Sequence, residues 1–331
     1  MKANNQTETN AEPLIIRASE VEPKEVKWLW YPYIPYGKVT IVQGNPGDGK
    51  STLLLTLSAK LTKGEILPFT EPEEVPKPMT VIYQTTEDDA DDTIVPRFIK
   101  AGGNRERLVF IKEDESPLSF ADERIGIALK KTGAKLLILD PLSSYIGDCS
   151  LNAANEVRPK FNHLIKAAKE NDCAIVVVDH MNKMQGQSVL LRTVGSIDIV
   201  GAVRSVITVI PDKVDRQKRY MVMTKANLAP LGTGIAFSIS NDGIEFLEEI
   251  DATADELMQS FSAEIGRPDE RLEEAMMFIS EMLSGGRLPS KECLERLKEA
   301  GIKESTAKKA KKKLGIVSTR PSLDWYWSLP Q

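Results

Sequence analysis

The most constraining feature of the chain is an eight-residue loop, GNPGDGKS, between two apolar runs. The run before it, KVTIVQ, has the β-branched composition of a buried strand, and the run after it, STLLLTLSAKL, has the composition of a helix. The spacing Gly44-x-x-x-x-Gly49-Lys50-Ser51 is that of a P-loop, whose glycines let successive backbone N–H groups turn toward one anion. Because the following helix directs its positive dipole end at the same point, the loop predicts a site for nucleotide phosphates.

We expect ATP and Mg²⁺ to bind at this loop. Lys50 should reach the β- and γ-phosphates, and the Ser51 hydroxyl should bind the metal. Asp48 is an acid where phosphates are expected, so we predict that its carboxylate points into solvent or toward a basic neighbour on another subunit. The predicted nucleotide-binding residues are Gly44, Asn45, Pro46, Gly47, Asp48, Gly49, Lys50, Ser51 and Thr52.

Later apolar runs also end in acidic residues. Asp140 follows the run KLLIL, and Glu87 follows TVIYQTT. Ligands of open α/β sheets bind at the carboxyl ends of the strands, so both acids are expected beside the P-loop. We predict that Asp140 binds Mg²⁺ directly or through water, and that Glu87 orients and deprotonates the attacking water. Asp88 and Asp89 are weaker candidates for the base because they fall one or two residues later.

The run CAIVVVDHMNK brings Asp179 and His180 to the same edge. A histidine that closes an apolar strand beside the γ-phosphate can sense whether that phosphate is present and pass the signal to the next loop. The alternative is a strand-end residue that only caps local structure.

The order of these runs predicts an α/β fold. Strands that alternate with helices form a parallel sheet covered on both faces. From Ser205 onward the strands are joined by short turns such as NDG, so the sheet should end in antiparallel strands. The predicted organisation is a flexible arm at 1–25, an ATPase domain at 26–250, a linker at 251–268 and a small DNA-binding domain at 269–331.

The small domain reads as three helices and a hairpin, which resembles a winged helix-turn-helix. Its last helix, TAKKAKKKL, has a narrow apolar side and an otherwise cationic surface. Such a helix favours salt-dependent contacts with the phosphates of duplex DNA, and a merely solvated helix face is the alternative. The predicted contact residues are Lys308, Lys309, Lys311, Lys312 and Lys313.

Bulk composition limits the remaining possibilities. Acidic residues outnumber basic ones 48 to 43, so contact with nucleic acid must come from local patches. The three cysteines are widely spaced, which predicts no zinc site and suits a reducing cytoplasm. The N-terminus has no apolar signal core, and no long apolar run occurs, so we expect a cytoplasmic protein without membrane contact.

Together the motifs resemble those of RecA-like ATPases of the RepA hexameric helicase type, an AAA-family group common on plasmids and phages. The similarity rests on GNPGDGKST, Glu87, LLILDPL, VVVDHMNK, VGSIDIVGAVRSV and MTKANLAPLG in this order, within about residues 25 to 250. It implies a RecA-like core, self-association into a hexameric ring, ATP between adjacent subunits, and movement along single-stranded DNA.

The resemblance also implies a basic residue supplied by the neighbouring subunit. In related DnaB-type rings a Lys-x-Arg motif follows a late strand, whereas TKANLAPLG has Lys225 but Asn227 in place of the arginine. Arg204 is the other candidate, because it precedes a strand and can stabilise charge on the leaving phosphate. Ordinary ion pairs within the chain are the alternative for both. For single-stranded DNA at the ring centre, the loop with Lys183 and Arg192 is the best candidate.

These observations predict an ATP hydrolase that acts as a ring-forming DNA helicase or translocase in the replication of a mobile element or phage. The alternative is a nucleotide-gated DNA-binding protein, a helicase loader, replication initiator or regulator, with slow hydrolysis. A third possibility is a recombinase-like open filament. Glu87 argues for the motor, because a slow switch has little use for a water-activating carboxylate.

Overall fold

The computed structural model describes residues 15–72, 74–113, 116–147, 154–181, 189–192, 197–258, 270–320 and 325–329. The chain divides into two compact units, Met1–Ala254 and Asp255–Gln331, which are described separately. Two structural features precede the main sheet: a 3-10 turn at Ala18–Glu20 and a small ribbon of β1 (Trp28–Trp30) and β2 (Ile34–Pro35). None of the helices in the described ranges is both long enough and apolar enough to span a membrane.

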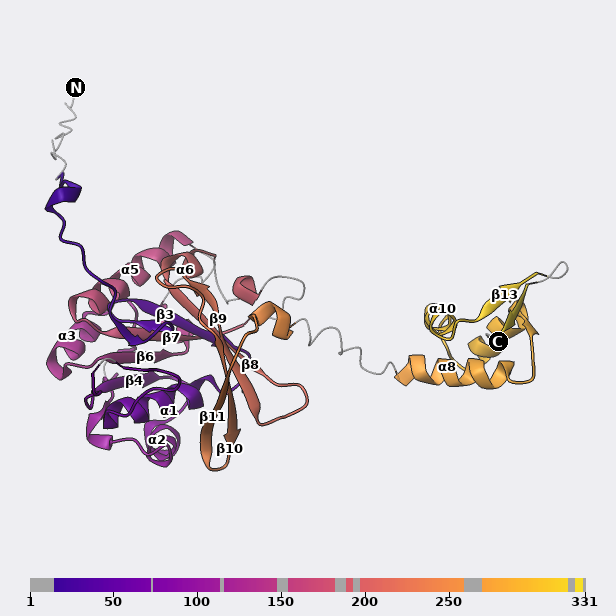
Figure 1. Ribbon diagram of the computed structural model, residues 1–331, viewed down its shortest axis with the longest axis horizontal. Helices are drawn as coiled ribbons and strands as arrows, with labels where there is room; N and C mark the ends of the chain where they lie inside the picture. Colours follow the sequence, from indigo (N-terminus) through magenta and orange to yellow (C-terminus); the bar gives the residue numbers. More distant parts are fainter. Residues whose placement is uncertain are drawn as a thin grey trace, which may run out of the picture. The chain divides into compact units, whose positions relative to one another are not determined.

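The larger unit is built on a nine-stranded sheet with the order β11-β10-β9-β8-β3-β7-β6-β4-β5 (Figure 1). The pairs from β8 to β5 are parallel, and those from β8 to β11 are antiparallel. The strands are β3 (Val39–Gly44), β4 (Val81–Thr85), β5 (Leu108–Val109), β6 (Leu136–Asp140), β7 (Ala174–His180), β8 (Ser205–Pro211), β9 (Lys218–Ala226), β10 (Gly234–Ser240) and β11 (Gly243–Ile250). The predicted RecA-like core, a mostly parallel sheet with antiparallel C-terminal strands, is confirmed.

Helices cover both faces of the sheet, because its central strands are apolar on both sides. On one face α1 (Lys50–Lys63) and α2 (Val95–Lys100) pack over a core that includes Leu53, Phe98 and Val178. The opposite core is covered by α3 (Glu123–Thr132), α4 (Leu142–Tyr145), α5 (Ala154–Glu170) and α6 (Ile197–Ala202). A short π-helical segment lies at Ala90–Ile94, and 3-10 turns lie at Arg105–Arg107 and Val189–Arg192.

Strand register brings the predicted chemical residues to one edge. β3, which leads into the P-loop, lies between β7 and β8, and Gly44 pairs with His180. β6 is one strand further away, and its Asp140 pairs with Thr85 of β4. Since these strands are parallel and end at the same level, their carboxyl ends form one continuous rim around the P-loop.

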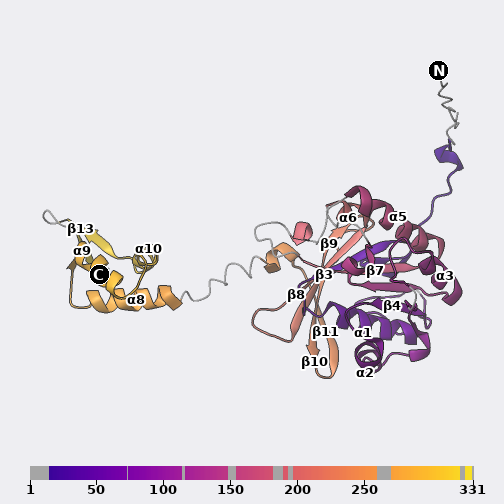
Figure 2. The ribbon, with the colours of Figure 1, turned by 180° about the vertical axis from the view of Figure 1, so that it is seen from behind.

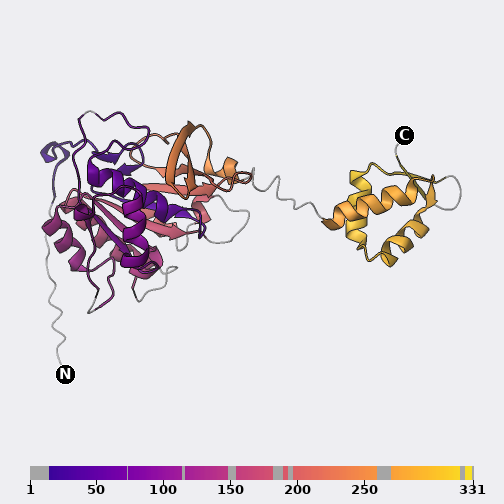
Figure 3. The ribbon, with the colours of Figure 1, turned by 90° about the horizontal axis from the view of Figure 1, so that it is seen from below.

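The smaller unit has its own core. It contains α8 (Glu270–Leu283), β12 (Leu288–Pro289), α9 (Ser290–Glu299), α10 (Glu304–Lys313), β13 (Val317–Thr319) and β14 (Tyr326–Ser328) (Figure 2, Figure 3). The strands form an antiparallel sheet in the order β12-β14-β13. The three helices α8, α9 and α10 and the sheet share one apolar core. This core includes Ile279, Leu297, Ala310 and Trp327. β12 is a strand that the sequence interpretation did not include.

Candidate nucleotide-binding site

The P-loop follows a fully buried strand and opens directly into α1. Gly49 caps the helix in the left-handed region with φ of 92°, where a side chain would be strained. A Cβ at Gly49 would also collide with Ile239 of β10, and one at Gly44 would lie 2.7 Å from the backbone oxygen of Val209. Gly44 is therefore required by the close approach of the β8 backbone, and Gly49 by its left-handed conformation.

A cavity of about 690 Å³ lies against this loop, which is within the usual range for small-molecule sites. The loop, α2 and the turn between β10 and β11 form its walls. Among the described residues, its lining includes Pro46, Gly47, Gly49, Lys50, Ser51, Thr52, Arg97, Lys100, Glu87, His180, Ile239 and Gly243. Its size and its cationic walls fit a nucleotide triphosphate. Of the predicted binding residues, Gly44, Asn45 and Asp48 are not among the described residues that line it.

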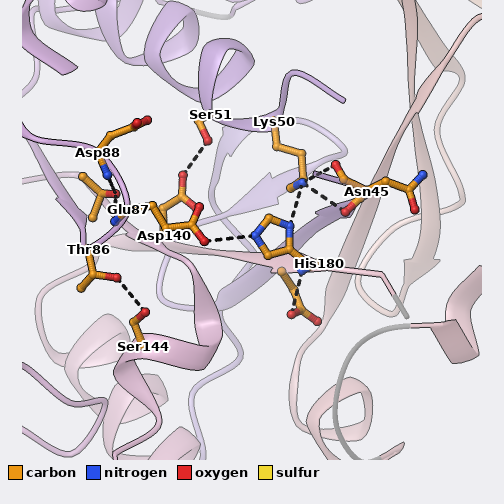
Figure 4. A network of polar contacts seen from close by, with 12 residues as sticks. Asn45, Lys50, Ser51, Thr86, Glu87, Asp88, Asp140, Ser144 and His180 are labelled. Carbon is orange, nitrogen blue, oxygen red and sulfur yellow. Dashed lines mark hydrogen bonds and ion pairs between the residues drawn. The ribbon is translucent and has the colours of Figure 1, made fainter. Parts of the chain in front are cut away.

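Lys50 lies in the cavity wall and is almost fully buried. Its Nζ donates to the backbone oxygens of Gly44 at 3.1 Å and Asn45 at 2.9 Å, so the side chain folds across its own loop (Figure 4). Burial lowers the pKa of Lys50, and the neighbouring carboxylates, Asp48 first and Asp140 next, oppose this effect. The ammonium is thus held by carbonyls and acids that a bound phosphate can replace.

Ser51 and Asp140 meet where a metal ion is expected. The Ser51 hydroxyl donates to Oδ2 of Asp140 at 2.7 Å, and the Tyr83 hydroxyl donates to the same oxygen at 3.1 Å. Burial raises the pKa of Asp140, although the hydrogen bonds from Ser51 and Tyr83 work in the opposite direction. A hydroxyl and a carboxylate side by side are oxygen ligands of the kind that Mg²⁺ prefers, so these residues fit the metal.

Tyr83 is a site residue that the sequence interpretation missed. It is completely buried in β4, and burial next to Asp140 raises its pKa well above the ordinary value. The sequence signal for Tyr83 was its hydroxyl within the otherwise apolar run of β4, the strand that pairs with the strand of Asp140.

His180 connects the lysine to the predicted base. Its Nδ1 lies 3.3 Å from Nζ of Lys50, and its Nε2 lies 3.4 Å from Oε1 of Glu87 (Figure 4). An ammonium can only donate, so Nδ1 accepts, and the ring proton on Nε2 is then directed at the carboxylate. The structure therefore brings Lys50, His180 and Glu87 into one chain of polar contacts on the cavity wall.

Glu87 keeps about half of its side chain exposed, 55%, which leaves it open to a water molecule in the cavity. The competing acid Asp88 instead accepts a hydrogen bond from Nη1 of Arg97 at 3.1 Å. Asp89 precedes the π-helical segment at Ala90–Ile94. The geometry is therefore more favourable for Glu87 as the base.

The predicted orientation of Asp48 is wrong. Its side chain is only 6% exposed, and its Oδ2 accepts the backbone N–H of Asn45 at 2.6 Å. The carboxylate lies behind the loop, on the side of the sheet. It therefore points neither into solvent nor toward a neighbouring subunit. The physical reason is that the first N–H of the tight loop needs an acceptor, and the aspartate supplies it from three residues away.

The family match to known proteins covers the part of the chain that contains this site. The family described as the AAA domain matches residues 5–186, more than half of the 331 residues. The chain belongs to this family. The matched range contains the P-loop, Glu87, Asp140 and His180, and the protein is thus an AAA-type P-loop ATPase of RecA-like fold.

Among solved structures, this chain is similar to a KaiC-like protein from the hyperthermophilic archaeon Pyrococcus horikoshii OT3. It is 19% identical, with a TM-score of 0.46, and the alignment covers 67% of this chain and 96% of that chain. No curated protein matches this AAA domain chain significantly.

The two candidate basic residues of the ATPase lie at the other end of the sheet. Arg204 immediately precedes β8, whose first residue, Ser205, pairs with Thr40 near the start of β3. Lys225 pairs with Val206, so it lies at the same level. The P-loop follows the opposite end of β3. Neither residue can therefore reach the cavity of its own chain.

Lys225 also has contacts within the chain. Its Nζ donates to the backbone oxygens of Val200 at 2.5 Å and Val203 at 2.9 Å, at the end of α6. Burial lowers the pKa of Lys225, and the positive charges of Arg204 and Arg158 lower it further. Arg204 and Arg158 are exposed, so three cations gather at this edge.

The structure describes the side chains of five of the seven predicted DNA-binding residues, all of them on α10. Lys183 is outside the described residues, and Arg192 ends the turn at Val189–Arg192, with a side chain outside the description. On α10, Lys308, Lys309, Lys312 and Lys313 are all exposed, and Lys308 also forms an ion pair with Glu304 at 2.8 Å.

Lys311 differs from the other lysines of α10. Its Nζ lies 4.4 Å from the centre of the Trp327 ring and donates to the Ser318 hydroxyl at 2.7 Å. Burial lowers the pKa of Lys311. Lys311 therefore fixes the helix to β13 and β14, and the outward cationic surface consists of its neighbours.

Proposed function

We propose that this ATPase is an ATP-dependent DNA helicase or translocase. In this proposal it assembles into a hexameric ring and hydrolyses ATP between subunits. The proposal is supported by the position of the candidate catalytic residues at opposite strand ends of one sheet. The P-loop edge holds Lys50, Glu87 and His180, and the opposite edge holds Arg204 and Lys225. A second copy is needed to bring the two sets together.

The chain's own residues supply the first part of the mechanism. Bound ATP and Mg²⁺ supply the phosphoanhydride bond and the charge that shields the phosphates. Lys50 and the loop N–H groups bind the phosphates, while Ser51 and Asp140 would hold the metal. Glu87 orients a water molecule and accepts its proton on a carboxylate oxygen. His180 donates from Nε2 to Glu87, which holds the base in position.

His180 also makes the site responsive to the nucleotide. Lys50 now donates toward Nδ1 of His180. A phosphate that takes Lys50 removes this contact and changes the position of the ring, and with it the contact to Glu87. The strand β7 ends at His180 and is followed directly by the loop with Lys183, the proposed contact for single-stranded DNA.

The neighbouring subunit would complete the site with a cation. A positive group beside the leaving phosphate stabilises the charge that develops during transfer, and such fingers contribute large rate factors. Arg204 is the stronger candidate, because it is exposed and Lys225 is committed to the carbonyls at the end of α6.

The smaller unit supports a second contact with DNA. The order of three helices and three short strands is that expected of a winged helix-turn-helix, with α10 as recognition helix and β13–β14 as wing. Exposed Lys309, Lys312 and Lys313 suit the phosphates of duplex DNA. The same unit is what favours the alternative function, a nucleotide-gated DNA-binding protein with slow turnover.

Subunit mixing tests the division of the site. Lys50→Ala removes the nucleotide contact but keeps the edge cations, and Arg204→Ala does the reverse. Each variant alone should be nearly inactive as an ATPase. In a random ring from equal amounts, about a quarter of the sites join an intact P-loop to an intact Arg204 edge, so turnover should return toward that fraction.

The control is Lys130→Ala, an exposed lysine on α3, which should be active alone. Mixed assemblies that form by light scattering yet stay inactive would contradict hydrolysis between subunits. Full activity of Arg204→Ala alone would transfer the role to Lys225 or remove it.

A further inference from the structure

The smaller unit carries an exposed aromatic ring that the proposed function does not use. Trp325, Tyr326 and Trp327 follow one another at the start of β14, and their environments differ. Trp327 is 6% exposed and belongs to the core, whereas Trp325 is 50% exposed. A single exposed ring is common on protein surfaces, so the neighbours of Trp325 decide what it can do.

The strand register places Trp325 beside a cation. Thr319 of β13 pairs with Tyr326, so the same register continued by one residue brings Arg320 opposite Trp325. Their two side chains lie on one face of the sheet. The guanidinium carbon of Arg320 is 5.9 Å from the centre of the Trp325 ring, which is within the range of a cation–π contact.

The same face of the sheet continues to α10. Two residues away from Arg320 and Trp325 along the strands lie Ser318 and Trp327, and both contact Lys311 of α10. The helix that carries the exposed lysines is thus joined to the face that carries the indole. Lysine is depleted in interfaces between proteins, whereas cations beside an aromatic ring suit the phosphates and flat bases of nucleic acid. The surface therefore favours nucleic acid over a protein partner.

The backbone of Trp325 is fixed in place. Its carbonyl oxygen accepts the N–H of Ser290, the first residue of α9, at 2.7 Å. The next residue, Tyr326, pairs with Pro289 of β12. The indole therefore projects from an anchored segment, and little conformational freedom is lost when a flat group stacks on it.

We propose that Trp325 is a stacking platform for an unpaired DNA base, with Arg320 beside it for the phosphate of the same nucleotide. Bases inside a duplex already stack on their neighbours, whereas an unpaired base has a free face for an aromatic ring. The lysines of α10 hold the phosphates of the adjacent duplex. The ligand of the smaller unit is therefore a junction between duplex and single-stranded DNA. This inference rests on the proposed contact of the smaller unit with DNA and names its ligand more narrowly.

A fluorescent base tests the stacking directly. Forked DNA with 2-aminopurine at the first unpaired position is titrated with the full chain in the absence of nucleotide. The unchanged protein should quench the probe, because 2-aminopurine loses fluorescence when it stacks. Trp325→Ala should abolish the quenching and weaken the fork about tenfold, as expected for the loss of one base–aromatic contact. Trp325→Phe keeps a ring and should retain most of both effects.

Blunt duplex DNA of the same length is the matched ligand. Trp325→Ala should bind it within about twofold of the unchanged protein, because it offers no unpaired base. Lys309→Ala is the control variant, since it removes an exposed cation of α10 and should weaken fork and blunt duplex by the same factor. A Trp325→Ala variant that binds the fork normally, still quenches the probe, or loses both DNAs equally would overturn the stacking role.

The two levels of inference fail separately. If Lys309→Ala and Trp325→Ala both bind fork and duplex as the unchanged protein does, the proposed contact of the smaller unit with DNA is wrong. If Lys309→Ala weakens both DNAs and Trp325→Ala weakens neither, only the stacking is wrong, and the exposed indole would then suit a protein partner.

Discussion

Replacing Asp140 by asparagine should remove function and raise stability. The carboxylate is 4% exposed, and its Oδ2 accepts hydrogen bonds from Ser51 and Tyr83. An asparagine carbonyl oxygen can accept both bonds, so Asp140→Asn keeps the local contacts and removes the charge. Burial raises the pKa of Asp140, which shows that the folded protein holds the charged form at a cost.

The magnitude follows from the surroundings of the carboxylate. Relieving a strained functional group typically gains about 0.5–2 kcal/mol, and we expect about 1 kcal/mol here because Lys50 partly compensates the charge. Lys50 is not left alone in the variant, since Asp48, Asp179 and Glu87 also act on it. For a unit of this size, about 1 kcal/mol raises the melting temperature by about 2–4 °C.

The gain should depend on pH. The pKa of Asp140 is higher in the folded protein than in the unfolded chain, so the folded state binds the proton more tightly. Stability of the unchanged protein therefore falls as pH rises from the unfolded pKa through the folded one, and the penalty is complete above it. The advantage of Asp140→Asn should be full near pH 7.5, roughly, and close to zero only below about pH 3, under the unfolded pKa of an aspartate.

Thermal unfolding followed by circular dichroism across this pH range, without nucleotide or Mg²⁺, measures the effect. Asp91→Asn is the control, because it makes the same change at an exposed acid and should alter the melting temperature little at any pH. An Asp140→Asn variant that melts below the unchanged protein at neutral pH would refute the reasoning. A gap that stays constant down to low pH would refute it equally.

Four further substitutions have distinct expected results. Tyr83→Phe removes the hydroxyl that donates to Asp140, so Mg²⁺-dependent nucleotide binding should need several-fold more metal, and stability should fall by about 1 kcal/mol; a Mg²⁺ titration with fluorescent ADP measures it. Gly49→Ala places a side chain at φ of 92° against β10 and should weaken ADP more than about tenfold by calorimetry. Lys311→Ala removes a cation from an indole ring and should destabilise the smaller unit by about 1 kcal/mol, whereas Lys309→Ala should leave its melting unchanged and weaken duplex DNA at low salt.

Much of the edge around the P-loop was predictable because strand ends in a parallel sheet share one level. An apolar run that stops at a polar residue marks that level, and this placed Glu87, Asp140 and His180 beside the loop. The RecA-like order of the sheet followed from the same alternation of strands and helices. The AAA domain family membership agrees with this part of the reasoning.

The remaining features depend on contacts between distant segments, which no local pattern contains. Asp48 was expected to point into solvent or toward another subunit, but it accepts the Asn45 N–H across the tight loop and is buried. Lys225 donates to the backbone oxygens at the end of α6, which lies more than 20 residues earlier in the sequence. Tyr83 looked like a core residue and Lys311 like a surface residue. Their roles follow from contacts across the fold, with Asp140 for Tyr83 and with Trp327 and Ser318 for Lys311.

Steady-state ATP turnover with and without single-stranded DNA, on the unchanged protein beside Glu87→Gln, tests the central claim most directly. We expect DNA to stimulate turnover strongly, and the glutamine variant to bind ATP but to hydrolyse it at least tens of times more slowly, because the base for the attacking water is lost. Slow turnover that is indifferent to DNA, or a Glu87→Gln variant that hydrolyses ATP normally, would contradict the proposed motor and its mechanism.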